Sequence, residues 1–243
     1  TTHQNTAFGS GAGSTSTGSA SVMIGYDAGK KGGTGTTAVG YDALSSSSLS
    51  ANYLTAVGST ALKNNTTGTN NTALGTDALL DNTTGAYNTC VGMNAGIRLS
   101  TGSNNTALGY NSLSSCVTAQ GTQNVAVGTN ALASALLGEM VAVGYNAARY
   151  QTSGEGGVFI GDSAGRGATG GATGSNNTVV GRDAMYNRTT ASECVVIGKN
   201  ALWSLTSGNN NVIIGTSAAA QATTARDNAG VGNGALSSIT SGI

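Results

Sequence analysis

The sequence predicts an all-β protein built as a parallel β-solenoid of about 14 short coils. Two observations carry this prediction. A glycine-centred phrase recurs about every 17 residues along the whole chain, and a short apolar run precedes its glycines. A fixed repeat of this kind is typical of a solenoid, in which each coil packs only against its neighbours.

The repeated phrase is clearest at residues 72–79, which read TALGTDAL. It consists of Thr or Val, a small or apolar residue, an aliphatic residue, Gly, any residue, Asp or Asn, Ala, and usually Leu. Its glycines are Gly9, Gly25, Gly40, Gly58, Gly75, Gly92, Gly109, Gly128, Gly144, Gly161, Gly181, Gly198, Gly215 and Gly232. The phrase leaves no room for a second kind of unit, so we expect residues 1–243 to form a single repeat array.

Each repeat is predicted to have three parts. A short strand ends at the glycine, as in residues 211–214 (NVII), where β-branched residues suit an extended segment. The residues after the glycine, such as 199–202 (KNAL), are expected to form a second short strand. A polar segment such as 101–105 (TGSNN) is expected to turn the chain back, because its Gly and Asn tolerate positive φ.

The recurring glycine is predicted to mark a structural turn. A position that accepts only glycine requires a positive φ or a close backbone approach, and we place it at the corner between the two strands. The longest gap between glycines contains a Gly-, Ala- and Thr-rich stretch at residues 165–174. This extra length is expected in a return loop, where insertions are tolerated.

The apolar pattern predicts a second chain. The two residues before the glycine are usually both apolar, as in Phe159 with Ile160 and Ile213 with Ile214. Because neighbours in a strand point to opposite faces, both faces of the strand are expected to be covered. One face lies inside the coil, and another copy of the chain is the natural cover for the other.

The chain starts and stops within a repeat. Residues 1–9 match most of residues 66–75, and residues 235–242 follow the pattern of residues 201–208. Solenoids usually carry capping units. We therefore expect a segment of a longer fibre, or a subunit that stacks end to end.

Composition excludes several classes of function. Charged residues are 8% of the chain, and ten basic residues balance ten acidic ones, so no nucleic-acid partner is expected. No apolar run is long enough to insert in a membrane as a helix. His3 is the only histidine, and Cys90, Cys116 and Cys194 fall at different points of their repeats. We expect no metal, no cofactor and no enzymatic activity, and we expect the cysteines to be packing residues.

Two rows of polar residues are candidate sites. The residue two after the glycine is repeatedly Asp or Asn, and these side chains are predicted to form a polar ladder along the stack. Its members are Asp27, Asp42, Asp77, Asn94, Asn111, Asn130, Asn146, Asp183 and Asn200. A cation between Asp27 and Asp42 is the alternative. Four tyrosines directly follow the glycine and are candidates for surface binding: Tyr26, Tyr41, Tyr110 and Tyr145.

The phrases at 55–58 (TAVG), 125–128 (VAVG) and 196–201 (VIGKNA) resemble the head repeats of trimeric autotransporter adhesins. With returns like residues 101–105, the repeat is also similar to the shafts of phage tail fibres and other bacterial trimeric fibres. The resemblance covers nearly the whole chain. It implies a left-handed parallel β-roll in which three chains pack about one axis, on an extracellular surface or a virion.

The leading hypothesis is a structural fibre segment that displays a receptor-binding tip, with the chain itself as the main partner. The alternatives are a self-assembling surface filament, or a solenoid that binds a cell-surface glycan, a receptor or ice. Threonine rows such as Thr72, Thr89 and Thr106 suggest ice, although unequal returns are expected to spoil a flat face. A carbohydrate-cleaving solenoid requires paired carboxylates, and the acids here are scattered.

Overall fold

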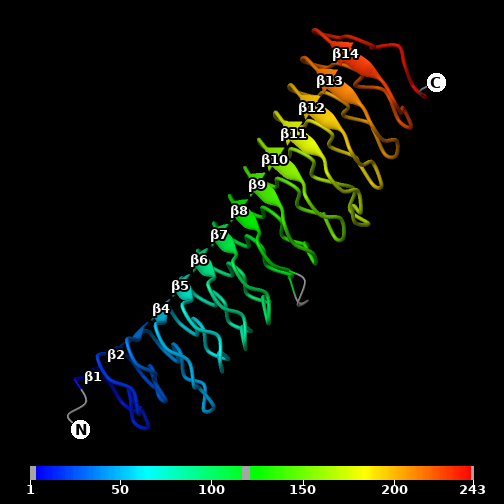
Figure 1. Cartoon of the computed structure of the whole chain (residues 1–243). Helices are drawn as coiled ribbons and strands as arrows, with labels where there is room; N and C mark the ends of the chain where they lie inside the picture. Colours follow the sequence, from blue (N-terminus) through cyan, green and yellow to red (C-terminus); the bar gives the residue numbers. More distant parts are fainter. Residues whose placement is uncertain (1–3, 117–120, 242–243) are drawn as a thin grey trace. The chain divides into compact units, whose positions relative to one another are not determined.

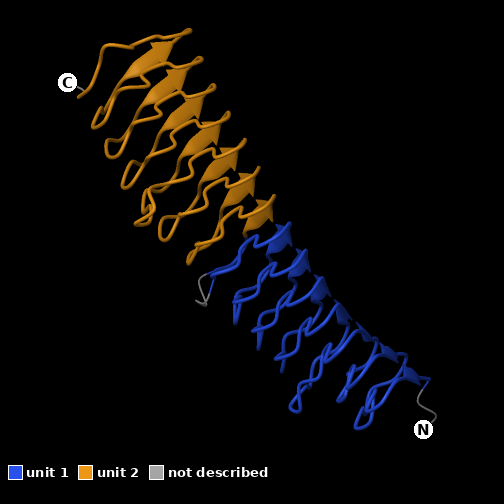
Figure 2. Ribbon diagram, turned by 180° about the vertical axis from the view of Figure 1, so that it is seen from behind, with its two compact units in different colours: residues 1–123 blue, residues 124–243 orange. Residues whose placement is uncertain are grey.

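Each coil contributes one strand of three residues, and every strand ends directly before a repeat glycine. The computed structural model describes residues 4–116 and 121–241. These fall into two units, residues 1–123 and 124–243, which Figure 2 shows in two colours. Unit 1 contains β1 (Thr6–Phe8), β2 (Val22–Ile24), β3 (Thr37–Val39), β4 (Thr55–Val57), β5 (Thr72–Leu74), β6 (Thr89–Val91) and β7 (Thr106–Leu108). Unit 2 contains β8 (Val125–Val127), β9 (Val141–Val143), β10 (Val158–Ile160), β11 (Thr178–Val180), β12 (Val195–Ile197), β13 (Val212–Ile214) and β14 (Ala229–Val231).

Within each unit the strands form one parallel sheet in chain order, β1 to β7 in unit 1 and β8 to β14 in unit 2. Equivalent residues pair without slippage, so that Thr55 lies between Thr37 and Thr72. In the described part of the chain there is no helix. The predicted all-β parallel solenoid is therefore confirmed for each unit.

Each coil leaves its strand along one limb and returns along another, and the core lies between these limbs (Figure 1). We call the residues that follow the repeat glycine the outgoing limb, and the residues that lead into the next strand the returning limb. The middle residue of the strand points inward, and at Ala56, Ala73 and Val196 it is fully buried. The fourth residue after the glycine, such as Leu62, is buried on the outgoing limb.

These two inward positions share one volume. The coils of β3, β4, β5, β7 and β8 combine an alanine at the strand centre with a leucine on the outgoing limb, as in Ala73 with Leu79. The order is reversed in the coil of β10, where a Cβ on Gly165 would lie 2.2 Å from the ring of Phe159. Native cores tolerate neither voids nor overlap, so the exchange keeps each coil filled.

The predicted second strand after the glycine is wrong. In the segment 199–202, Asn200 and Leu202 have φ values of 57° and 47°, in the left-handed region. Extended strands need negative φ, so this segment forms consecutive turns instead. It still bonds to its neighbours, because Leu202 N donates to Ala218 O in the next coil and Asn200 N to Arg182 O in the preceding one.

The repeat glycine combines a positive φ with a close approach between coils. Gly58 has a φ of 137°, and a Cβ at this position would lie 2.4 Å from the carbonyl oxygen of Gly75. Both requirements that the sequence suggested are present at this residue. The glycine follows the strand and opens the turns of the outgoing limb, rather than joining two strands.

A buried asparagine column supports the returning limb. Asn88 accepts hydrogen bonds at Oδ1 from Asn105 N and Asn105 Nδ2, each at 3.0 Å, and its own Nδ2 donates to Gly102 O at 2.9 Å. Asn71 makes the equivalent bonds one coil earlier. The column satisfies backbone groups that would otherwise be buried without partners.

Candidate functional site

The candidate functional site is the outer strand face, which we define as the first and third side chains of every strand. These side chains point away from the core, because strand neighbours alternate between faces. The third residue is apolar in every described strand: Phe8, Ile24, Val39, Val57, Leu74, Val91, Leu108, Val127, Val143, Ile160, Val180, Ile197, Ile214 and Val231. Each is half-buried or exposed. A continuous aliphatic row therefore runs along each unit.

The first residue of the strand differs between the units. In unit 1 it is a threonine in β3 to β7, and these five residues are in register: Thr37, Thr55, Thr72, Thr89 and Thr106. In unit 2 it is most often a valine, in β8, β9, β10, β12 and β13. The outer strand face of unit 1 thus pairs hydroxyl-bearing and aliphatic rows, whereas that of unit 2 is mainly aliphatic.

The predicted Asp and Asn row lies at the start of the outgoing limb. All nine residues have φ values from 51° to 60°. Asn94 donates to Asn111 at 3.0 Å and Asn130 to Asn146 at 3.1 Å, so these pairs bridge neighbouring coils. The side chain thus serves a turn position that Asn and Asp adopt more easily than most residues.

Lysines neutralise the two carboxylates that suggested a cation. Lys30 Nζ lies 3.4 Å from Asp27, and Lys63 Nζ lies 2.9 Å from Asp42. The hydrogen bond from Lys63 to Asp42 raises the pKa of Lys63. The described residues contain no cluster of three potential metal ligands.

Two of the four candidate tyrosines form a stacked pair. The rings of Tyr26 and Tyr41 lie 5.4 Å apart and nearly parallel. Tyr110 and Tyr145 are exposed and belong to different units. The structure therefore brings together Tyr26 and Tyr41 alone of this set.

Two groups of charged residues in unit 2 were not predicted from the sequence. The first is an arginine–aromatic column on the outgoing limbs, consisting of Arg149, Tyr150, Arg166, Tyr186 and Trp203. The Arg166 guanidinium lies 4.7 Å from the ring centre of Tyr150 and 4.8 Å from that of Tyr186. Arg149 lies 5.0 Å from Tyr150, and the Trp203 ring stacks on Tyr186 at 5.7 Å.

The second pattern is an acidic edge on the returning limbs, consisting of Glu139, Glu155, Glu193 and Asp227. All four side chains are exposed and come two or three residues before a strand. The glutamates are spread over the chain at uneven intervals. Their alignment becomes visible only when the sequence is written coil by coil.

Arg188 is a buried cation in the core of unit 2. Its Nε donates to Gly165 O at 3.2 Å, and its guanidinium lies 4.6 Å from the ring centre of Phe159. Burial lowers the pKa of Arg188 to about 9. Burial also raises the pKa of the Cys90 thiol to about 12. Cys90, Cys116 and Cys194 are all buried, as expected for packing residues.

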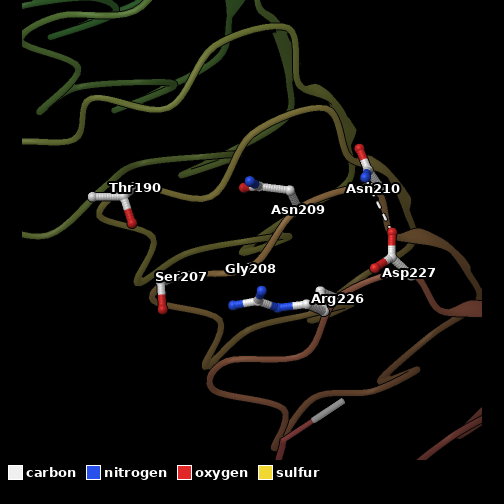
Figure 3. A pocket seen from close by; sticks show the side chains of 7 residues that line it. All are labelled: Thr190, Ser207, Gly208, Asn209, Asn210, Arg226 and Asp227. Atoms are coloured by element: carbon white, nitrogen blue, oxygen red, sulfur yellow. Dashed lines mark hydrogen bonds between the residues drawn. The ribbon is translucent and has the colours of Figure 1, made fainter. Parts of the chain in front are cut away.

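The surface hollows are open and polar. One of about 390 Å³ in unit 2 is lined by Thr190, Ser207, Gly208, Asn209, Asn210, Arg226 and Asp227. Figure 3 shows Arg226 and Asn209 extending away from the pair in which Asn210 donates to Asp227 at 3.0 Å. The lining contains one carboxylate, whereas glycoside cleavage uses two. A second hollow of about 370 Å³, in unit 1, is lined by Lys31, Leu49 and otherwise small or polar residues.

Two further predictions concern membrane insertion and the lone histidine. Within the ranges that the structure covers, no helix is long and apolar enough to span a membrane. His3, on which the exclusion of a histidine-based triad rested, lies outside the described residues.

No protein-family model matches the chain, no curated protein matches it, and no solved structure matches it.

Proposed function

We propose that this chain is a structural segment of a fibre, in which further copies of the chain cover the outer strand face. It has no enzymatic role. The observation that carries the proposal is the aliphatic row, which every strand of both units continues at the same position. Parallel sheets are normally covered on both faces, and contiguous exposed apolar patches mark interaction surfaces.

Unit 2 supports this proposal most strongly. In β10, β12 and β13 the two outward residues are Val158 and Ile160, Val195 and Ile197, and Val212 and Ile214. If this face of the strand were exposed to water, its two outward residues would be polar instead. Covering these side chains with a second copy removes apolar surface from water, which is favourable.

The finer parts of the proposal rest on the family resemblance of the repeats. We propose that three copies pack about one axis, and that the fibre stands on a cell surface or virion and displays a receptor-binding tip. A repeat fold with regular backbone hydrogen bonds between coils and continuous apolar rows suits a stiff spacer. Catalysis is not required of any described residue.

The test is the accessibility of a thiol placed on the outer strand face. In Ile197→Cys the new thiol is expected to react at least tenfold more slowly with iodoacetamide in concentrated protein than after dilution into dissociated chains. Ser47→Cys is the control, because Ser47 is exposed in a loop of unit 1, away from the strands and from the acidic edge. Equal rates for both variants at all protein concentrations would contradict the proposal.

A second candidate function is binding to ice, favoured by the threonine row of unit 1. From the sequence, the unequal lengths of the returns were expected to disturb this face. Instead the strands stay in register from Thr37 to Thr106, because the extra residues lie in the returns. Measured thermal hysteresis that Thr72→Lys abolishes would favour ice binding, and its absence would leave the fibre proposal alone.

A further inference from the structure

We infer that the arginine–aromatic column of unit 2 binds the acidic edge of unit 2 in a neighbouring copy of the chain. This inference rests on the proposed self-association and specifies which surfaces meet.

Arg166 is held ready to bind a carboxylate. Tyr150 and Tyr186 lie on its two sides at 4.7 Å and 4.8 Å, so the guanidinium is fixed between two rings. Stacking uses the faces of the guanidinium and leaves the N–H groups at its edge for a bidentate acceptor. Among the described residues, the ion pairs of unit 2 consist of Arg182 with Asp183, so Arg166 has no carboxylate partner within its own unit.

The acidic edge has the complementary property. Glu139, Glu155 and Glu193 are exposed, and none takes part in an ion pair among the described residues. Asp227 differs, because it accepts a hydrogen bond from Asn210 of the preceding coil and is therefore already engaged within its own chain. We therefore assign the interaction to the glutamates.

The two surfaces lie at matching levels of the stack. Arg149 and Glu155 belong to the same coil, between β9 and β10. Arg166 belongs to the next coil, and Glu193 to the one after it. Glu193 N donates to Ser175 O, and Asn176 N to Glu155 O, so the glutamates occupy one aligned row. Copies related by rotation without translation place equal levels side by side, so Arg166 is flanked by Glu155 and Glu193 of its neighbour.

Cyclic symmetry also requires two different surfaces. A ring of three copies has heterologous interfaces, in which one surface of a chain meets another surface of the next. The column lies on the outgoing limbs and the acidic edge on the returning limbs, on either side of the core. Charge complementarity of this kind mainly fixes partner orientation and register, while the aliphatic row supplies the apolar contact.

The experiment compares charge reversals on the two surfaces. Arg149→Glu with Arg166→Glu places acid against acid, and Glu155→Arg with Glu193→Arg places base against base. Each pair of substitutions is expected to weaken association at least tenfold, measured as the concentration dependence of mass by multi-angle light scattering at low salt. Combining all four substitutions restores complementarity and is expected to restore the wild-type mass. High salt should reduce the differences in association between the variants and the wild-type protein, because exposed charges are screened.

Lys31→Glu with Arg98→Glu is the matched control for the arginine reversals. It changes the net charge by the same amount, but in unit 1, and should leave the mass of the assembly unchanged. The glutamate variant remains informative if loss of the column unfolds unit 2, because Glu155 and Glu193 make no ion pair with any described residue of their own chain. A wild-type assembly that both reversals leave intact would overturn this inference and spare the proposed function. A monomeric wild-type protein would overturn both.

Discussion

Units 1 and 2 build the same coil from different side chains. In unit 1 the strand centre is alanine in β3, β4, β5 and β7, and the core is completed by leucines such as Leu62 and Leu79 on the outgoing limb. In unit 2 the centres of β8 and β9 are still alanine, and those of β10 to β13 are larger: Phe159, Val179, Val196 and Ile213. The row of first strand residues also changes, from mainly threonine to mainly valine, whereas the third residue is apolar in both units.

This comparison distinguishes the backbone features that every coil shares from the side chains that vary between coils. The repeat glycine keeps a φ near 130° in both units, from Gly9 to Gly232. Core volume is divided freely between the strand centre and the outgoing limb. The outward side chains are constrained neither by the φ of the repeat glycine nor by the core volume. Their composition therefore reflects what each outer strand face contacts. We expect this to be the second copy of the chain, most extensively at unit 2.

The requirement common to both units gives the largest expected effect. Gly215→Ala places a Cβ 2.1 Å from the Gly232 carbonyl oxygen, whereas Gly232→Ala meets no atom within 4 Å. Both variants carry backbone strain of about 1–3 kcal/mol, since each φ is positive. We expect Gly215→Ala to lose in addition the cooperative unfolding of its coils, measured by urea denaturation. Equal stability of the two variants would refute the close approach.

Exchanging core volume within one coil gives the next largest effect. Phe159→Ala is expected to lower the unfolding free energy by about 3–5 kcal/mol, because it leaves a cavity. Gly165→Leu should recover part of this loss in the double variant. Gly165 has a φ of 53°, and Leu202 adopts 47° at the equivalent position, so the backbone accepts leucine.

The control for this exchange is Gly165→Leu alone, which overlaps the Phe159 ring and should destabilise the protein. A double variant no more stable than the sum of the two single effects would show that the positions do not share a volume.

The asparagine column gives a smaller effect of opposite sign in the two units. Asn88→Cys in unit 1 removes the acceptor for Asn105 N and the donor to Gly102 O, at a cost of about 1–3 kcal/mol. Cys194 occupies the same position in unit 2, between Asn177 and Asn211. Cys194→Asn is therefore expected to stabilise the protein by about 1 kcal/mol. Calorimetric melting of both variants provides the measurement, and a change of the same sign in both would argue against a continuous column.

The last effect concerns Cys90 and appears only at alkaline pH, so that it contributes nothing at neutral pH. Its thiol has a pKa of about 12 in the fold, above its ordinary value of 9.0, because burial disfavours the thiolate. The unfolded chain loses this proton first, so the unfolding free energy should fall as pH rises from about 9 to about 12. Cys90→Ala should show a shallower fall over this window. Identical pH profiles would mean that the thiol is not buried in solution.

The coil period, the position of the strand and the positive φ of the glycine were predictable, because each depends on residues repeated at a fixed spacing. The second strand was predicted wrongly, since the left-handed φ of Leu202 has no local signal in a short segment such as KNAL, although Asn200 is a residue type that adopts such a φ readily. The asparagine column had a signal: asparagine recurs four residues before the glycine at Asn71, Asn88 and Asn105.

The charged surfaces of unit 2 had a weaker signal. Arg149 and Arg166 lie five residues after their glycines, but Tyr150 lies six residues after, so the column follows no single register. Its existence depends on how aromatic and guanidinium groups stack between coils. The buried state of Arg188 depends in turn on small neighbours such as Gly165, which sequence spacing alone does not reveal.

The mass of the wild-type protein in solution tests the central claim most directly, which is that a second chain covers the outer strand face. Multi-angle light scattering over a range of protein concentrations provides this mass. The account predicts a species of about three times the chain mass of 23.6 kDa. A monodisperse monomer at all concentrations would contradict it.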